Sequence, residues 1–399
     1  MLRLTFLSHT AMGGPFVVGS HQLAKALAKR GNSVVHISAP LSPAHLSLTF
    51  GDAHARLRWR RWLTGGAQMN GVREVVPLTA LPWSLLRNSV RGWKVYSGCL
   101  FESPFRRISY QQLRSSDCIL IDEPRFVGLL GGLREVPIIY RATDLYAQQR
   151  NDPTIEAAER MLCARADVLL ATSEPVAAHL TALSNRPVSI VTNGVEYEHF
   201  AQASPQPATS LLTQIGSRAS RAVYVGAFDS RFGENILLNA VRALPQATFV
   251  LVGPGSKEMA ARWALPNVMG LGAQPYQRLP GIFKECSVGL LPLSSAPENA
   301  GRSPMKLYEY LAAGLAVAAT STEELRRRAL PATCLAHTEA DFPAAVTSAF
   351  SMAKQPDVLA GARECARTQS WSAKAAGIEE LAANARSLPS APIRVSACP

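Results

Sequence analysis

One stretch of the sequence decides the fold: Ser303-Pro304-Met305-Lys306-Leu307-Tyr308-Glu309-Tyr310-Leu311-Ala312-Ala313-Gly314. It predicts a short helix with Ser303 as its N-cap and Pro304 at the first helical position, where a missing N–H costs nothing. Gly314 ends the helix, and Leu315-Ala316-Val317 begins the next strand. Because the first-turn N–H groups are unpaired and the helix dipole makes this end positive, we expect it to bind a negatively charged group.

Two charged residues of this helix, Lys306 and Glu309, allow two interpretations. A cation in the first turn opposes the helix dipole, which is reasonable if a diphosphate lies there. Glu309, one turn further on, would then accept hydrogen bonds from ribose hydroxyls. Alternatively, the two residues form a solvated ion pair on an ordinary amphipathic helix. The residues alone leave both interpretations open.

Strand-like and helical runs alternate through almost the whole chain, which is typical of a doubly wound α/β protein. Each half opens with a strand, a glycine loop and a helix, so we predict two Rossmann-like domains that face each other across a cleft. The expected domains are residues 1–200 and 221–399, joined by a linker at 201–220, and the last helix could cross back to the first domain. The expected strands are residues 4–7, 33–38, 73–76, 118–121, 137–140, 168–171, 188–191, 222–225, 248–252, 267–269, 287–291 and 316–319.

The composition excludes several classes of protein. A chain of 399 residues with 47% hydrophobic and 18% charged residues suits two globular domains rather than a disordered polymer. Seven scattered cysteines without a Cys-x-x-Cys pair, and the lack of an Asp-x-Asp pair, argue against a metal site. No apolar run is long enough to span a bilayer, and the N-terminus lacks the features of a signal peptide. We therefore expect a cytoplasmic protein that needs no metal.

The net charge of +12 is concentrated between residues 56 and 114, which hold eleven Lys or Arg, two Glu and four of the six tryptophans. Basic residues interleaved with Trp suit an anionic lipid surface. A basic amphipathic helix near residues 86–96 would contribute to that surface, although it could instead pack on its own domain with a solvated charged face. No nucleic-acid-binding module is present, so nucleic acid is not an expected partner. The residues predicted to face the membrane are Trp59, Arg60, Trp62, Arg87, Arg91, Trp93 and Lys94.

The stretch from Ser303 to Val317 resembles the nucleotide-binding segment of GT-B glycosyltransferases. Asn193-Gly194-Val195 followed by Phe200 is similar to the segment that closes their N-terminal domain, and Val223-Tyr224-Val225-Gly226 looks like the first strand and loop of their donor domain. Within that fold the chain resembles the xanthan-type glucuronosyltransferase (GumK-like) group. The shared motifs are Leu41-Ser42-Pro43, Tyr140-Arg141-Ala142-Thr143-Asp144 and Met305-Lys306-Leu307.

The resemblance implies a nucleotide-sugar donor, such as UDP-glucuronate, and no other cofactor. It also implies an acceptor saccharide linked to polyprenyl diphosphate in exopolysaccharide synthesis, at the inner face of the cell membrane. Two departures from the family matter: Gly301 stands in place of the first of two Glu often found in retaining enzymes, and an aromatic nucleotide contact of the glucuronosyltransferases falls near Leu293. The first favours an inverting enzyme, and the second leaves the donor sugar open. The residues that the resemblance and the helix assign to the donor are Gly226, Ala227, Phe228, Ser303, Met305, Lys306 and Glu309.

An inverting transfer needs a base that removes the proton of the acceptor hydroxyl. Asp144 follows the strand at 137–140, at the sheet edge where ligands bind in open α/β folds, and the resemblance assigns it this role. Asp122 and Glu123, at the end of the preceding strand, are alternatives. Asp144 could instead cap the next helix or turn.

The loop after the first strand offers weaker candidates, His9, Gly13 and Gly14, for contact with the acceptor or the donor phosphates. Two other functions remain open at this point. One is a nucleotide-sugar epimerase of similar two-domain architecture, which would not need a lipid surface. The other is a GT-B protein that has lost catalysis and only binds partners.

Overall fold

The computed structural model describes residues 1–399 except 15–16, 47–48, 50–51, 203–219 and 388–399. The chain divides into two compact units, Met1–Thr192 with Ser372–Pro399, and Asn193–Trp371. The division between them precedes the predicted linker at 201–220, most of which lies outside the described residues. The last helix, α18 (Trp371–Ser387), lies almost wholly in the first unit.

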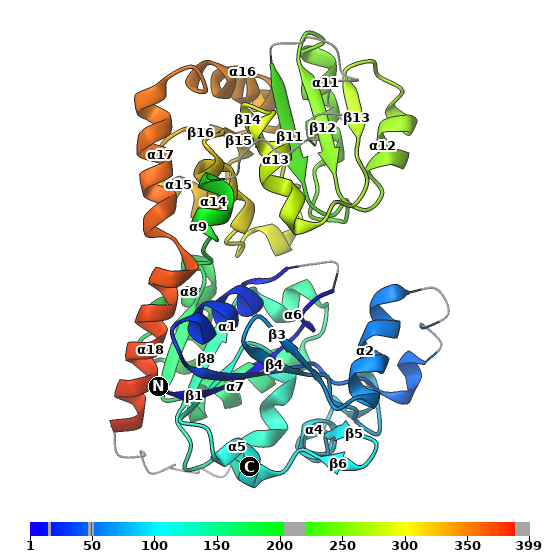
Figure 1. Ribbon diagram of the computed structural model, residues 1–399, viewed down its shortest axis with the longest axis vertical. Coiled ribbons are helices and arrows are strands. Elements are labelled where there is room, and N and C mark those ends of the chain that lie inside the picture. The colour runs from blue at the N-terminus through cyan, green and yellow to red at the C-terminus, as the bar shows by residue number, and fades with distance from the viewer. Residues whose placement is uncertain (15–16, 47–48, 50–51, 203–219, 388–399) are drawn as a thin grey trace. The chain divides into compact units, whose positions relative to one another are not determined.

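The first unit contains an eight-stranded sheet in the order β10-β9-β8-β7-β1-β2-β4-β3 (Figure 1). Neighbouring strands are parallel except β3 and β4, which are antiparallel. The central strands are apolar on both faces, as expected when helices cover both sides of a parallel sheet. The strands are β1 (Arg3–Ser8), β2 (Ser33–Ser38), β3 (Ala67–Met69), β4 (Val72–Val75), β7 (Cys118–Ile121), β8 (Ile138–Ala142), β9 (Val168–Ala171) and β10 (Ser189–Ile190).

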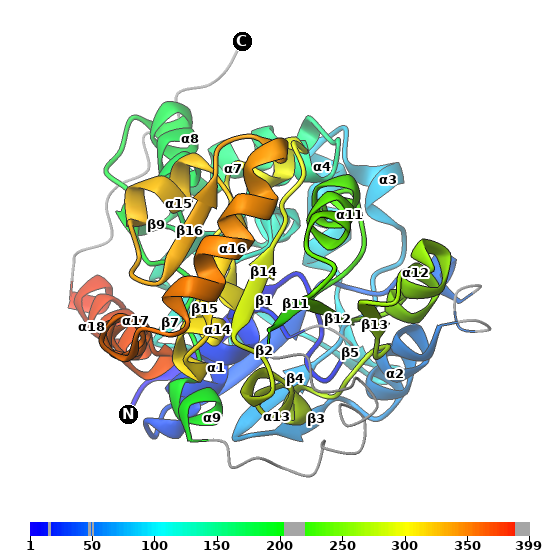
Figure 2. The same cartoon turned by 90° about the horizontal axis from the view of Figure 1, so that it is seen from above.

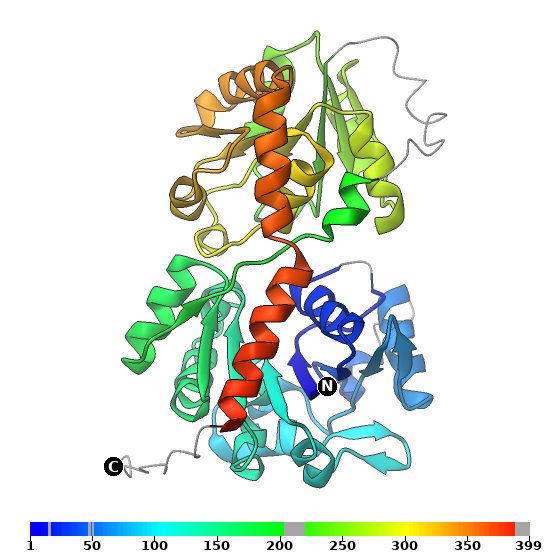
Figure 3. The same ribbon diagram turned by 60° about the vertical axis from the view of Figure 1, so that its left-hand side comes forward.

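Helices and a small hairpin complete this unit. Helix α18 lies beside α1 (Figure 3), and Glu379 accepts hydrogen bonds from Arg30 Nε (2.6 Å) and Asn32 Nδ2 (2.9 Å). The other elements are α1 (Gly19–Lys29), α2 (Ala53–Leu63), α3 (Trp83–Leu86), α4 (Val90–Gly98), α5 (Tyr110–Arg114), α6 (Tyr146–Gln149), α7 (Thr154–Arg165), α8 (Glu174–Ser184) and the hairpin of β5 (Phe101–Ser103) and β6 (Arg106–Arg107).

The second unit contains a six-stranded, wholly parallel sheet in the order β13-β12-β11-β14-β15-β16. Helices α11 and α16 pack against each other over this sheet (Figure 2), and α14 contacts α13, α17, β14 and β15. The strands are β11 (Arg221–Val225), β12 (Thr248–Val252), β13 (Val268–Gly270), β14 (Val288–Leu291), β15 (Ala316–Thr320) and β16 (Thr333–Ala336). The helices are α9 (Tyr197–Ala201), α11 (Glu234–Ala243), α12 (Ser256–Trp263), α13 (Leu279–Lys284), α14 (Met305–Ala313), α15 (Glu323–Arg328), α16 (Phe342–Met352) and α17 (Pro356–Thr368).

In both sheets, successive strands are added first on one side of the first strand and then on its other side. The chain runs from β1 to β2 on one side and later returns to β7 on the other, and β11 stands in the same way between β12 and β14. In open α/β sheets the carboxyl ends of strands at such a switch point form the ligand site. The doubly wound α/β prediction is therefore confirmed, and every predicted strand is present; β3, β5, β6 and β16 were not predicted.

Candidate active site

The helix that decides the fold, α14, begins one residue later than predicted, at Met305. Pro304 is its N-cap, with φ −71° and ψ 116°, so the prediction of Ser303 as N-cap is wrong. The Ser303 hydroxyl oxygen instead accepts hydrogen bonds from Asn193 N (3.1 Å) and Arg328 Nη2 (2.9 Å). Gly314 ends the helix in a left-handed conformation, φ 82°, as predicted. No side chain of the described residues caps the start of α14, which keeps its positive end open to a ligand.

Lys306 and Glu309 form the ion pair that the sequence left as an alternative. Lys306 Nζ lies 2.6 Å from Glu309 Oε2. The pair is not solvated, however, because the Glu309 side chain is only 4% exposed and that of Lys306 is 25% exposed. A cation at a helix start is therefore held in place by a buried carboxylate, and this arrangement keeps it ordered beside the open N–H groups.

The loop after β11 approaches the same region from the neighbouring strand. The Tyr224 hydroxyl donates to Ala227 O (2.6 Å), and the Phe228 ring packs edge-on against Tyr224. Gly253, at φ 145°, follows β12, and a Cβ there would lie 1.9 Å from Gly226 O. Only glycine therefore allows the two loops to meet. The predicted donor residues Gly226, Ala227 and Phe228 are thus held firmly by contacts that the sequence did not reveal.

A buried hydroxyl connects this loop to α14. Tyr310 is fully buried, and its hydroxyl oxygen accepts a hydrogen bond from Val225 N (3.0 Å), the last residue of β11. The carboxyl end of β11 and the helix after β14 are therefore fixed to one another at the switch point of the sheet. Leu293, near which the sequence resemblance places an aromatic nucleotide contact, is buried. Its backbone forms an isolated antiparallel β-bridge with Phe232.

In the first unit, the carboxyl ends of β7 and β8 carry the predicted acids. Asp122 and Arg141 are both completely buried, with Arg141 Nη1 3.2 Å from Asp122 Oδ2. Burial raises the pKa of the Asp122 carboxyl, and the Arg141 guanidinium opposes this rise. Asp122 therefore belongs to a buried ion pair within the sheet edge.

Glu123 is held by two arginines. Its carboxylate accepts bidentate hydrogen bonds from Arg125, at 3.0 and 2.8 Å, and from Arg150, at 2.8 and 3.0 Å. Burial alone would raise the pKa of Glu123, but the two guanidinium groups hold it well below its usual value. Arg125 was not predicted, although an Arg two residues after an acid at a strand end is the pattern that would have indicated it.

Asp144 lies in the loop after β8 and is half-buried. Its Oδ2 is 3.5 Å from Thr143 Oγ1. Leu145, the residue after Asp144, is the N-cap of α6. Of the three acids, Asp144 therefore has the most accessible carboxylate.

The loop after β1 places His9 beside this edge, while neighbouring side chains fill the space at its glycines. Burial lowers the pKa of His9 to about 4, so its ring is neutral at pH 7, and its buried Nδ1 has no partner in the described chain. A Cβ at Gly13 would lie 2.8 Å from Arg61 Nη2, and one at Gly14 would lie 2.5 Å from the His54 ring.

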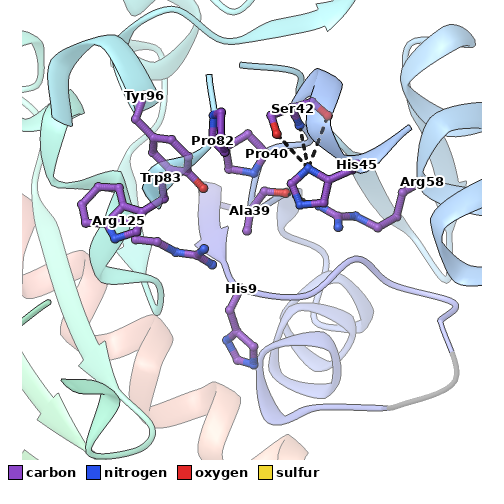
Figure 4. Close-up of a pocket in the computed structure, with 10 residues that line it drawn as sticks. All are labelled: His9, Ala39, Pro40, Ser42, His45, Arg58, Pro82, Trp83, Tyr96 and Arg125. Atoms are coloured by element: carbon purple, nitrogen blue, oxygen red, sulfur yellow. Dashed lines mark hydrogen bonds between the residues drawn. The ribbon is translucent and has the colours of Figure 1, made fainter. Parts of the chain in front are cut away.

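A cavity of about 320 Å³ opens beside His9 within the first unit (Figure 4). Arg125, Tyr96 and Trp83 lie on one side of it, and His45 and Arg58 on the other. Arg58 comes from α2, at the start of the basic segment that was assigned to a membrane surface. No feature of the sequence distinguishes this arginine from its exposed neighbours.

The structure corrects part of the predicted membrane surface. The helix expected near residues 86–96 is broken, since α3 ends at Leu86 and α4 begins at Val90. Trp93 was predicted to face lipid but is 6% exposed, and its Nε1 donates to Arg87 O (2.6 Å). It packs inward because a large aromatic ring gains more from burial than from solvent. Trp59 and Trp62 are half-buried and pack edge to face.

Several basic residues of this segment are nevertheless exposed, namely Arg60, Arg91 and Lys94, whereas Arg87 pairs with Asp152 at 3.3 Å. Phe105, at the tip of the β5–β6 hairpin, is 99% exposed. Within the described ranges, no helix combines the length and the apolar character needed to cross a bilayer.

Two family models match the two halves of the chain. The model described as "Glucuronosyltransferase GumK, N-terminal domain" matches residues 6–172, and the one described as "Glycosyl transferases group 1" matches residues 219–351. Among curated proteins, "Putative teichuronic acid biosynthesis glycosyltransferase TuaH" of Bacillus subtilis (strain 168) is 28% identical over 255 residues, or 59% of this chain. The match spans 64% of that relative's length.

Solved structures resemble the chain over almost its whole length. HepE of Anabaena in complex with UDP-glucose has a TM-score of 0.68 at 16% identity, and the match covers 96% of this chain and 100% of HepE. Sucrose-phosphate synthase of Thermosynechococcus elongatus has a TM-score of 0.70 at 16% identity, with 96% and 98% covered. At these identities the similarity shows the fold, which confirms the predicted GT-B fold. Together with the family models it confirms the predicted resemblance to the GumK-like group.

Proposed function

We propose, on the premise that the chain is a GumK-like protein of the GT-B glycosyltransferase fold, that it transfers a sugar from a UDP-sugar to a hydroxyl group of an acceptor saccharide. The observation that carries this proposal is the open start of α14, beside the ordered Lys306 ammonium and next to the glycine loop of β11. The presence of UDP-glucose in the HepE complex supports the same class of donor for this chain.

On the donor side, the diphosphate would accept hydrogen bonds from the first-turn N–H groups of α14, at Met305 and Lys306. The Lys306 ammonium would neutralise the charge that grows on the leaving diphosphate, so that no metal is needed. Glu309 would accept a hydrogen bond from a ribose hydroxyl and keep Lys306 in place. Gly226, Ala227 and Phe228 would lie against the nucleotide, and Ser303 fixes the start of the helix through Asn193.

On the acceptor side, Asp144 would act as the base of an inverting reaction. As the acceptor oxygen forms its bond to the anomeric carbon, the bond from that carbon to the diphosphate oxygen breaks. The proton of the acceptor hydroxyl passes to the Asp144 carboxylate, and UDP leaves with the bonding electron pair. Asp144 supports this role because it is the accessible acid at this sheet edge, while Glu123 is held by two arginines.

The finer proposal concerns substrate and place. We infer that the donor is UDP-glucuronate and that the acceptor is a saccharide linked to polyprenyl diphosphate in exopolysaccharide synthesis at the inner face of the cell membrane. The match to the GumK N-terminal domain and the name of TuaH, a teichuronic acid biosynthesis protein, support these choices. Exposed Arg60, Arg91 and Lys94 with Phe105 support contact with an anionic lipid surface.

The decisive experiment compares Asp144→Asn with Glu135→Gln, a control that neutralises an exposed acid in the loop before β8. We expect Asp144→Asn to bind UDP as the unsubstituted protein does and to lose transfer by about 10²-fold or more, the usual contribution of a general base. Glu135→Gln should keep both properties. Most of the normal turnover in Asp144→Asn would contradict the assignment, and conversion of the donor without any acceptor would favour an epimerase.

A further inference from the structure

The cavity beside His9 has no role in the reaction described above, yet its walls have an unusual chemistry. Two guanidinium groups reach it from different elements: Arg58 from α2 and Arg125 from the segment after β7 (Figure 4). The indole of Trp83 and the phenol of Tyr96 complete one side. All of these residues belong to the first unit.

The cavity carries more positive charge than its surroundings balance. Arg58 donates to Ala39 O (2.7 Å), its buried Nε has no hydrogen-bond partner, and it forms no ion pair with any described residue. Arg125 must share the single carboxylate of Glu123 with Arg150. Arg58 is half-buried, and the acids Glu74 and Asp52 act on it without forming an ion pair. Guanidinium groups that are partly shielded from water and incompletely paired are costly, so this arrangement favours the entry of an anion.

A neutral donor points into the same space. Tyr96 is 3% exposed, and its hydroxyl projects toward the cavity (Figure 4). That hydroxyl makes no hydrogen bond to the described residues, and burial raises its pKa, so it keeps its proton and can donate it. Two guanidinium groups and a buried phenol match the oxygens of a phosphate better than they match an uncharged sugar.

We propose that this cavity binds the diphosphate group of the acceptor, a proposal that rests on the proposed function and adds a second anion site in the first unit. The diphosphate oxygens accept hydrogen bonds from Arg58, Arg125 and Tyr96, and the aromatic ring of Trp83 lines the adjoining wall.

The sheet order makes this position useful for catalysis. His9 follows β1 and Arg125 follows β7, whereas Asp144 follows β8, the next strand after β7. Neighbouring strands lie about 4.8 Å apart, so β8 is about 10 Å from β1. A saccharide attached to a diphosphate in the cavity can therefore reach Asp144 along the same sheet edge. Anchoring the diphosphate would select which hydroxyl of the acceptor meets the base.

The test is a calorimetric titration of inorganic pyrophosphate into the full chain, in the presence of EDTA and of saturating UDP to fill the donor site. Arg58→Gln should weaken pyrophosphate binding at least tenfold, and Arg58→Lys should recover part of it. Arg56→Gln, which removes an exposed arginine from the same helix, should change it less than twofold. Tyr96→Phe, which removes only the hydroxyl, should weaken binding about threefold and serves if Arg58→Gln does not fold.

The outcomes separate this proposal from the proposed function. If UDP does not bind, the donor assignment fails, and the pyrophosphate titration without UDP still tests the cavity. If UDP binds but pyrophosphate does not, or if Arg58→Gln and Tyr96→Phe bind it as tightly as the unsubstituted protein, the cavity proposal is overturned. Orthophosphate and glucuronate should bind more weakly than pyrophosphate, and tighter binding of glucuronate would assign the site to an acidic sugar instead.

Discussion

The Lys306–Glu309 ion pair allows the binding role of α14 to be separated from its structural role. Glu309 is 4% exposed and lies 2.6 Å from Lys306 Nζ, so Lys306→Met leaves a buried carboxylate without its cation. Removal of one partner of a fully buried pair costs about 3–5 kcal/mol. Because the Lys306 side chain is 25% exposed, we expect a smaller fall in the free energy of unfolding, about 2 kcal/mol.

The double variant Lys306→Met/Glu309→Gln removes the stranded charge and should regain most of that stability. UDP affinity should respond differently. A hydrogen bond from the ammonium to a phosphate oxygen contributes about 1.5–3 kcal/mol, which corresponds to about 10- to 150-fold in Kd. Both the single and the double variant should therefore bind UDP at least tenfold more weakly, although their stabilities differ.

Urea unfolding followed by tryptophan fluorescence measures the stabilities, and calorimetry measures UDP binding. Lys354→Met, the loss of an exposed lysine in the same unit, is the matched control and should change neither quantity. Recovery of UDP affinity in the double variant would show that Lys306 only stabilises the helix. Unchanged stability in Lys306→Met would refute the reasoning from burial.

Three other measurements test separate parts of the structure. Gly253→Ala should reduce both UDP affinity and stability, because its Cβ would lie 1.9 Å from Gly226 O, whereas Gly361→Ala, with open space around it, should be neutral or slightly stabilising; equal effects would contradict the geometry. Burial lowers the pKa of His21 from 6.5 to about 3, so the unfolded chain takes up a proton that the folded chain does not, and stability should fall as the pH drops below 6.5. That loss reaches about 2 kcal/mol by pH 5 for this group, and His21→Gln should show a correspondingly flatter pH profile of unfolding; an unchanged profile would exclude His21 as its source. Phe105→Ser should reduce the affinity for anionic vesicles, measured by flotation, by about tenfold or more without a change in thermal unfolding, since a buried Phe contributes about 1.5–3 kcal/mol, and equal flotation with neutral and anionic vesicles would argue against the lipid surface.

The start of α14 shows which structural features could be predicted from neighbouring residues in the sequence and which could not. The helix, its end at Gly314 and the following strand could all be predicted, because each depends on neighbours in the sequence. The cap could not be predicted, because the Ser303 hydroxyl is engaged by Asn193 and Arg328, which are remote from it in the chain. A Ser-Pro pair satisfies the statistics of a helix start in either register, and tertiary contacts decide between them.

In the basic segment, by contrast, the sequence could not predict the environment of each side chain. Its charge could be counted from the sequence, but its residues occupy three environments: Arg58 lines a cavity, Arg73 pairs with the buried Glu102, and Arg91 is exposed. A helical wheel assumes an unbroken helix, whereas Ser89 caps a new one by accepting a hydrogen bond from Gly92 N at 3.0 Å. The direction of each side chain depends on that break.

The three acids at the edge of the first sheet show why access, rather than basicity alone, selects a base. Protonation of Glu123 would leave Arg125 and Arg150 without their shared counter-ion, and its low pKa reflects how strongly they oppose it. Asp122 has the raised pKa that suits proton transfer, but its side chain is completely buried against Arg141, where no acceptor hydroxyl can reach it. Asp144 is half-buried, so its carboxylate is more accessible than that of Asp122 or Glu123. A base must first touch the proton that it removes, and for this reason we propose the half-buried loop acid Asp144 as the base.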